Sequence, residues 1–233
     1  GAEILEGSTD EVVEKLVEQQ GDFKVTNMLF SQIRERVPRL LTSIENNVQR
    51  IKEIVNELKD FSRQMPPEMA DGVDIKKAVK NSIGLVSNLI KKSTNCFSVH
   101  YDDDIPTIYA NTRRIEQVII NLLVNACQAL PNRQCGVTVT VSFNKESDTV
   151  NVEIIDEGIG IPPDVIDKIK DPFFTTKRNS GGTGLGLAIS DRIIRDHYGS
   201  LVFLSTLGKG TTVRLILPRN IQAKYADSKV KHD

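Results

Sequence analysis

Cysteines, aromatic residues and long apolar runs are all scarce in this sequence of 233 residues. Its three cysteines, Cys96, Cys127 and Cys135, form no CxxC pair and leave an odd thiol in any pairing, which argues against a disulfide-stabilised secreted fold. No stretch approaches the roughly 20 apolar residues that span a bilayer, so we expect no membrane contact. The formal net charge is only −1, so we also expect no nucleic-acid binding.

The N-terminus lacks the basic-then-apolar order of a secretory signal peptide. Together with the cysteine pattern, this predicts a reduced, cytoplasmic setting. The leading Gly1-Ala2 pair is typical of a cloning remnant, so we interpret the chain as a fragment of a longer protein. Whether that parent is anchored in a membrane upstream of Gly1 stays open.

A long heptad pattern occupies Ser31–Arg63 and predicts a helix with one apolar seam. The seam consists of Val37, Leu41, Ile44, Val48, Ile51, Val55 and Leu58, widened by Leu40, Ile54 and Phe61. We place Pro38 in the first turn, where a missing N–H costs little. A dimerising bundle is favoured over the core helix of a monomer, because the seam is longer than one small domain covers. A short amphipathic helix is also expected at Asp10–Gln20.

Two prolines and a glycine in QMPPEMADG, residues 64–72, indicate a linker. We therefore expect a helical segment at residues 1–65, a second domain at 66–220 and a polar, frayed tail at 221–233.

The second domain mixes helical and strand patterns. Helices are expected at Ile75–Lys92, Asn111–Leu130 and Leu187–Tyr198. The β-branched stretches FSVHY, VTVTVSF, TVNVEIID, SLVFLST and TTVRLIL predict strands, and NKESD predicts a hairpin turn between two of them. This order favours an α+β sandwich, with a mixed, largely antiparallel sheet covered by helices on one face.

A glycine-rich run precedes the last predicted helix. Gly182, Gly184 and Gly186 spell GxGxG, which is neither a dinucleotide fingerprint nor a Walker loop. Taken alone, the run fits a phosphate cradle at a helix N-terminus and a plain flexible loop equally well.

Three further stretches favour a nucleotide. Asn121 and Asn125 lie four apart, so both amides share one helical face, where a hydrated cation and phosphate oxygens could satisfy them. Asp156 ends a strand and precedes two spaced glycines in DEGIGIP, and its carboxylate could accept the exocyclic amine of adenine. GKGTT, residues 208–212, is a second tight turn whose threonines could line the same pocket.

These motifs, in this order, resemble the ATP-binding domain of sensor histidine kinases, in the superfamily that includes gyrase, Hsp90 and MutL. The resemblance covers about residues 71–219. The matching residues are Asn121 and Asn125 (N box), Asp156, Gly158 and Gly160 (G1 box), Phe173 and Phe174 (F box), Gly182, Gly184 and Gly186 (G2 box), and GKGTT. It implies a Bergerat sandwich binding Mg-ATP under a mobile lid, roughly Pro163–Thr183, preceded by the second helix of a dimerisation bundle.

The resemblance also implies residue roles. Asn125 would ligate Mg²⁺ with Asn121 beside it, Asp156 would read adenine, and Lys177 would meet a phosphate as a point charge. Asn121, Asn125 and Lys177 are the implied catalytic residues. The implied ATP-binding set is Asn125, Asp156, Gly158, Gly160, Phe174, Thr176, Lys177, Gly182, Thr183, Gly184, Leu185, Gly186 and Thr211.

Residue 121 bears on the chemistry. ATP-hydrolysing members of the superfamily carry a glutamate base at that position, and the amide of Asn121 cannot take a proton at neutral pH. We therefore expect bound ATP to be kept for phosphoryl transfer to a histidine, and from there to an aspartate in the receiver domain of a response regulator. A non-catalytic nucleotide-sensing homodimer is the alternative, and an ATP-hydrolysing relative is less favoured.

The acceptor histidine that the resemblance calls for is missing. The sequence contains three histidines, His100, His197 and His232. None of them precedes the heptad segment, and we interpret all three as structural or surface residues. The fragment is therefore expected to be unable to phosphorylate itself.

Overall fold

The computed structural model describes residues 24–25, 28–62, 69–176 and 182–220 of the chain. The chain divides into two compact units, residues 1–56 and 57–233, and each is described by itself. The helix predicted at Asp10–Gln20 and the predicted tail lie outside the described residues, as does the first part of the predicted linker, residues 64–68.

Helix α2 (Phe30–Ser62) confirms the single helix predicted from the heptad pattern. It follows the paired dipeptide strands β1 (Lys24–Val25) and β2 (Met28–Leu29). The placement of Pro38 in the first turn was wrong, because the helix begins at Phe30 and Pro38 is its ninth residue. The missing N–H therefore removes one interior hydrogen bond, which the remaining helix tolerates.

The apolar seam of α2 is exposed. The described seam residues, each 45% to 60% exposed, are Val37, Leu40, Leu41, Ile44, Val48, Ile51 and Val55. At Ile54, Leu58 and Phe61 the structure describes the helical backbone but not the side chains. No helix in the described part of the chain has both the length and the apolar character that crossing a bilayer requires.

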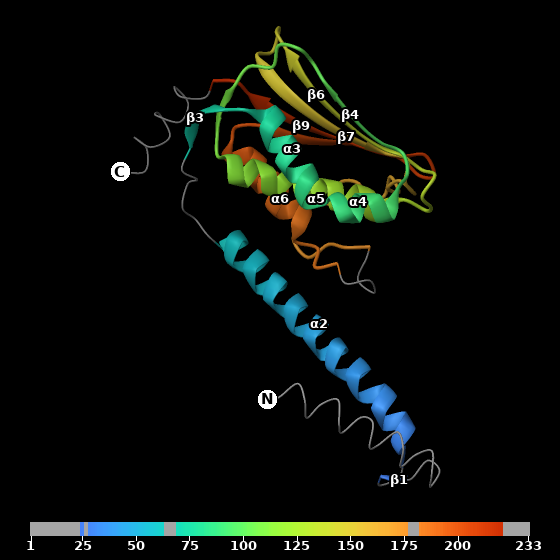
Figure 1. Cartoon of the computed structure of the whole chain (residues 1–233). Coiled ribbons are helices and arrows are strands. Elements are labelled where there is room, and N and C mark those ends of the chain that lie inside the picture. The colour runs from blue at the N-terminus through green and yellow to red at the C-terminus, as the bar shows by residue number, and fades with distance from the viewer. Residues whose placement is uncertain (1–23, 26–27, 63–68, 177–181, 221–233) are drawn as a thin grey trace, which may run out of the picture. The chain divides into compact units, whose positions relative to one another are not determined.

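The second unit is an α+β sandwich, as predicted (Figure 1). Its main sheet has the order β4-β6-β7-β9-β8, and only the β4–β6 pair is parallel. The strands are β4 (Phe97–Tyr101), β6 (Val137–Asn144), β7 (Thr149–Asp156), β8 (Ser200–Thr206) and β9 (Gly210–Pro218). The helices α3 (Ile75–Leu85), α4 (Ser87–Ser93), α5 (Thr112–Ala129) and α6 (Gly186–Asp196) lie on one side of this sheet. The predicted hairpin at NKESD joins β6 to β7.

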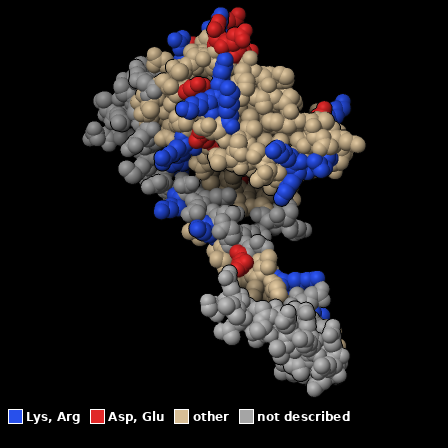
Figure 2. Space-filling model, in the orientation of Figure 1, with Lys and Arg blue, Asp and Glu red and all other residues tan. Residues whose placement is uncertain are grey.

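The core forms where the inward faces of the sheet and helices meet. Residues of β7 alternate between buried and half-buried, as strict period-2 patterning requires. On α5, buried side chains recur every three or four residues, and the side chain of Asn111 caps the helix by accepting a hydrogen bond from Arg114 N at 3.0 Å. The described face in Figure 2 intersperses basic and acidic side chains, in keeping with the small net charge.

Two local predictions need correction. The helix predicted at Ile75–Lys92 is two helices, because the backbone of Val86 leaves the helical region with φ −103° and ψ 12°. Residues 70–72 of the predicted linker belong to strand β3 (Ala70–Val73), which pairs with β5 (Ile108–Ala110). Both strands are too short to show a clear alternation, so their pairing depends on tertiary packing.

His197 is buried where α6 ends, with 2% of its surface exposed. Its Nδ1–H donates to the carbonyl oxygen of Ile193 at 2.7 Å, and its Nε2 accepts from the backbone N–H of Asn111 at 3.0 Å. Burial lowers the pKa of His197 below the ordinary 6.5; the Ile193 bond and Asp196 oppose this shift, and Arg114 adds to it. The interpretation of His197 as structural is confirmed, because the neutral ring ties α6 to the start of α5.

The lowered pKa of His197 predicts the sign of a pH effect. The unfolded chain binds the proton below about pH 6.5 while the folded ring stays neutral, so the free energy of unfolding should fall as pH drops from 6.5 towards 5. In urea unfolding at pH 7.5, His197→Gln should lower the free energy of unfolding by about 1–3 kcal/mol. The free energy of unfolding of this variant should also depend less on pH. His100→Gln, at an exposed position of β4, is the matched control. Parallel pH profiles for His197→Gln and the unmodified chain would contradict this assignment.

Candidate functional site

Asp156 lies at the end of the central strand β7 and is only 6% exposed. Its Oδ1 accepts the backbone N–H of Gly158 at 2.9 Å and that of Thr211, on β9, at 3.2 Å. Backbone donors of this kind satisfy a buried carboxylate and fix its orientation. The predicted adenine-reading residue is therefore held in place by the loop that follows it and by strand β9.

The glycines around Asp156 are required by close contacts within the protein. A Cβ on Gly158 would lie 2.6 Å from Asp156 Oδ1 and 2.8 Å from the Cβ of Ala129, at the end of α5. Gly160 has φ +70° and Gly210 has φ +107°, and a Cβ on either would meet a backbone carbonyl oxygen. The close approach that these glycines allow is to the protein's own chain.

The two asparagines lie on α5, half-buried and hydrogen-bonded to one another. Asn125 Nδ2 donates to Asn121 Oδ1 at 3.4 Å, and Asn121 Nδ2 donates to the Ser190 hydroxyl, on α6, at 2.9 Å. A Cβ on Gly186 would lie 2.6 Å from Asn121 Oδ1, so a larger residue there would displace the Asn121 amide. These contacts bring the N box and the G2 box together.

The G2 run leads directly into the N-terminus of α6. Leu185 is buried, and its N–H is capped by the Thr183 hydroxyl at 3.2 Å. Gly184 has φ +72° and its carbonyl accepts the N–H of Phe173 at 2.9 Å. The first N–H groups of a helix have no intrahelical acceptor and carry the positive end of its dipole, so this end of α6 suits an anion.

One face of α5 joins the two ends of the site. Asn121, Asn125 and Ala129 are spaced four apart and so lie in one row. Asn121 meets Gly186 at one end of this row, and the Ala129 carbonyl accepts the N–H of Ile159 at 3.0 Å at the other. Eight residues of helix span about 12 Å, so the row extends from the N-terminus of α6 to the loop after Asp156.

The other predicted residues are placed less specifically. Phe174 is half-buried, Thr176 is exposed and Gly182 is half-buried. Lys177 lies outside the described residues. Thr211 is buried beside Asp156, with its hydroxyl 2.9 Å from that of Ser205.

Two serines in the site were missed by the sequence analysis. Ser190 holds the amide of Asn121, and the Ser205 hydroxyl accepts the N–H of Ile161 at 2.8 Å while it donates to the Gly210 carbonyl at 3.0 Å. Ser205 thereby ties the loop after Asp156 to the β8–β9 turn. Only its spacing from Gly186 could have pointed to Ser190, since residues four apart share a helical face.

Cys127 is buried on α5 behind the site. Burial raises the pKa of its thiol, the charge of Asp156 raises it further, and a hydrogen bond with Ser93 works in the opposite direction. The thiol therefore stays protonated at neutral pH and packs as a small apolar side chain.

Comparison with known proteins agrees with this geometry. Residues 110–221 match the family of histidine kinase-, DNA gyrase B- and HSP90-like ATPases. The chain is 34% identical to the sensor kinase CckA of Brucella abortus, over 80% of this chain and 21% of that protein. It is 36% identical to the sensor histidine kinase ZraS of Escherichia coli K12, over 75% of this chain and 36% of that protein. The chain thus spans well under half the length of these relatives.

Solved structures agree as well. The catalytic domain of the histidine kinase ThkA superposes with a TM-score of 0.58 at 29% identity, over 66% of this chain and 99% of that domain. Full-length ShkA in complex with AMPPNP has the same fold, with a TM-score of 0.67 at 24% identity over 84% of this chain and 40% of ShkA. Both likenesses confirm the Bergerat sandwich. The chain therefore carries an ATP-binding catalytic domain of the sensor histidine kinase type, within the family of histidine kinase-, DNA gyrase B- and HSP90-like ATPases.

Proposed function

We propose that this domain binds Mg-ATP and transfers the γ-phosphoryl group to a histidine on a helical bundle, from which it passes to an aspartate in the receiver domain of a response regulator. The row Asn121–Asn125–Ala129 on α5 supports this proposal best. It connects the buried carboxylate of Asp156, which could accept a hydrogen bond from adenine, to the N-terminus of α6. Asp156 would accept the exocyclic amine of adenine. The backbone amides of Gly182–Gly186 and the ammonium of Lys177 would hold the phosphates.

The residues present fit a magnesium ion. The amide NH₂ of Asn125 donates a hydrogen bond to Asn121, so the Oδ1 of Asn125 points away from Asn121. Amide and phosphate oxygens with several waters suit Mg²⁺, which rarely uses an all-protein cage. The described residues contain no group of three or more His, Cys, Asp or Glu side chains that could hold a metal, so the amides are the candidate ligands. We assign Asn125 as the ligand and Asn121 as its partner; the ion would neutralise phosphate charge.

Asn121 also decides the fate of bound ATP. Its Nδ2 is occupied by Ser190 and its Oδ1 faces Asn125, so nothing at this position can remove a proton from water. Transfer is then a matter of positioning the phosphoryl group and stabilising its charge, with the acceptor imidazole as nucleophile. A steady ATP hydrolase is not favoured.

The acceptor histidine is not among the described residues of this chain. His197 is buried and doubly hydrogen-bonded, and His100 lies on β4 of the sheet. We therefore infer that the chain does not phosphorylate itself and acts on a histidine supplied in trans.

Replacement of Asp156 tests nucleotide recognition. Asp156→Asn exchanges one acceptor for a donor that faces the adenine amine, so the affinity for Mg-ADP should fall about tenfold to a hundredfold in calorimetry. Discrimination against guanine nucleotides should fall with it. Glu157→Gln is the matched control, because its side chain is exposed and an amide oxygen can still accept the N–H of Gly136. Unchanged Mg-ADP affinity in Asp156→Asn would refute the assignment.

Phosphotransfer in trans tests the kinase activity. The chain, labelled Mg-ATP and a separate histidine-bearing helical domain should yield acid-labile phosphohistidine. Asn125→Ala should reduce the yield at least tenfold and remove the gain in ATP affinity that Mg²⁺ confers. Asn81→Ala, on the exposed side of α3, should change neither. A domain that binds Mg-ATP but never labels the acceptor would favour a nucleotide-sensing role instead.

The exposed seam of α2 supports self-association as a bundle. Apolar rows of this length are buried in a partner in stable helical assemblies. Ile44→Lys combined with Val48→Lys should shift the chain towards the monomer in sedimentation equilibrium. Thr42→Lys places one such charge at an exposed position outside the seam and should leave the equilibrium as it is. Identical sedimentation of all three proteins would argue against the seam as an interface.

A further inference from the structure

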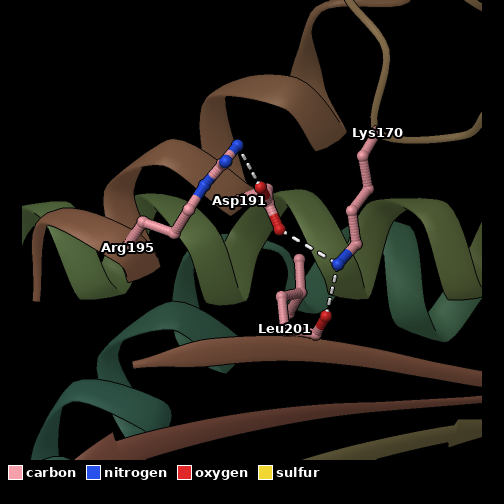
Figure 3. Close-up of polar contacts among 4 residues, drawn as sticks. All are labelled: Lys170, Asp191, Arg195 and Leu201. Atoms are coloured by element: carbon pink, nitrogen blue, oxygen red, sulfur yellow. Dashed lines mark hydrogen bonds and ion pairs between the residues drawn. The ribbon is translucent and has the colours of Figure 1, made fainter. Parts of the chain in front are cut away.

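An ion-pair cluster lies outside the predicted nucleotide residues (Figure 3). Asp191, on α6, has a side chain only 9% exposed, and its Oδ1 lies 3.0 Å from Lys170 Nζ. Its other oxygen pairs with the guanidinium of Arg195, one helical turn further along. Lys170 Nζ also donates to the backbone carbonyl of Leu201, on β8, at 2.6 Å. One ammonium thus joins three segments of the chain.

Lys170 comes from a stretch that we name the turn segment, residues 162–174. Its backbone is a series of turns, in which Val165 N donates to Pro162 O at 3.2 Å, Lys168 N to Val165 O at 2.9 Å and Asp171 N to Lys168 O at 2.9 Å. The ammonium of Lys170 also lies 5.5 Å from the centre of the Phe203 ring, on β8. The cluster therefore attaches the turn segment to α6 and to the edge of the sheet.

Asp191 does not need Lys170 in order to be neutralised. Arg195 lies on the same helix at the i+4 position and pairs with the other carboxylate oxygen, so Asp191 keeps a cationic partner when the charge of Lys170 is removed. The Lys170 side chain is 35% exposed, so solvent screens its attraction to Asp191 and the pair contributes little net stability. What Lys170 adds, and Arg195 cannot add, is a connection to a different segment.

That connection lies three residues before Phe173, which contacts the G2 run. The N–H of Phe173 donates to the Gly184 carbonyl at 2.9 Å. A Cβ on Gly184 would lie 2.8 Å from the Cα of Phe173, so the two backbones touch. Three residues reach about 10 Å at most, so the position of Lys170 limits where Phe173 can sit against Gly184. Gly184 in turn precedes the N-terminus of α6, where we place the triphosphate.

We propose that Lys170 is a positioning residue for the phosphate end of the nucleotide site, and that its link to Asp191 and Leu201 holds the turn segment against the G2 run. This inference rests on the proposed function, since it concerns how the same site binds ATP. It predicts that removing the ammonium loosens the Phe173–Gly184 contact and weakens Mg-ATP binding, while the fold persists.

The test compares the two cations that share Asp191. Lys170→Met keeps the length of the side chain and removes its charge, so Mg-ATP affinity should fall about five- to thirtyfold in calorimetry. Arg195→Met removes the other partner of the same carboxylate and should leave Mg-ATP affinity within about twofold of the starting value. Lys170→Arg should restore most of the affinity, because it restores the charge. Thermal unfolding without nucleotide checks that all three proteins remain folded.

Amide hydrogen exchange without nucleotide separates this proposal from the proposed function. Exchange at Phe173 should accelerate in Lys170→Met and remain slow in Arg195→Met, while exchange within α5 is unchanged in both. If the unmodified chain fails to bind Mg-ATP, the proposed function fails, yet the exchange result still decides whether Lys170 holds the turn segment. Equal behaviour of the two methionine variants in binding or in exchange would overturn the positioning role.

Discussion

The buried carboxylate of Asp156 is satisfied by two backbone N–H groups, from Gly158 and Thr211. The arrangement of the surrounding site depends on the close approach of these two groups. A carboxylate that is 6% exposed needs donors close by, and side chains on the flanking loops would block them. Gly158 and Gly210 remove that obstacle, because a Cβ on either would collide with Asp156 itself. The ends of β7 and β9 and the tip of α5 can then meet around one buried oxygen.

Helix α5 extends that arrangement to the phosphate end. Its inward face packs on the sheet, while the row of Asn121, Asn125 and Ala129 contacts α6 at one end and the loop after Asp156 at the other. Because a helix of this length is stiff, the two ends are kept at a set separation. A nucleotide bound along the row would therefore find both ends preorganised, which favours positioning of the phosphoryl group over reaction with water.

The polar chemistry of this row is consistent with transfer to another acceptor. Asn121 donates to Ser190 and accepts from Asn125, so in the proposed function it would orient the metal ligand and would supply no base. The Lys170–Asp191 pair attaches the turn segment to the same helix. Helix α6 is thus contacted by α5 at Ser190 and by the turn segment at Asp191.

Much of the fold and part of the site could be predicted from the sequence, because local pattern determines them. The strict alternation in TVNVEIID predicts a strand, and the heptad seam predicts α2, whatever surrounds them. The order of the asparagine, aspartate and glycine motifs likewise indicated a nucleotide site without reference to geometry. Short strands such as β3, and the break at Val86, carry no such pattern and were missed or merged.

Only the tertiary structure decided which residues hold those motifs in place. Ser190 lies 69 residues from Asn121, and Lys170 lies 31 residues from the Leu201 carbonyl that it contacts. Apart from the spacing of Ser190 from Gly186, nothing in the local sequence distinguishes either residue from an ordinary serine or lysine. The sequence by itself determined the elements and the reactive groups. Their supports arise only when packing of α5, α6 and the sheet brings distant segments within hydrogen-bond distance, because a hydrogen bond depends on separation in space and not along the chain.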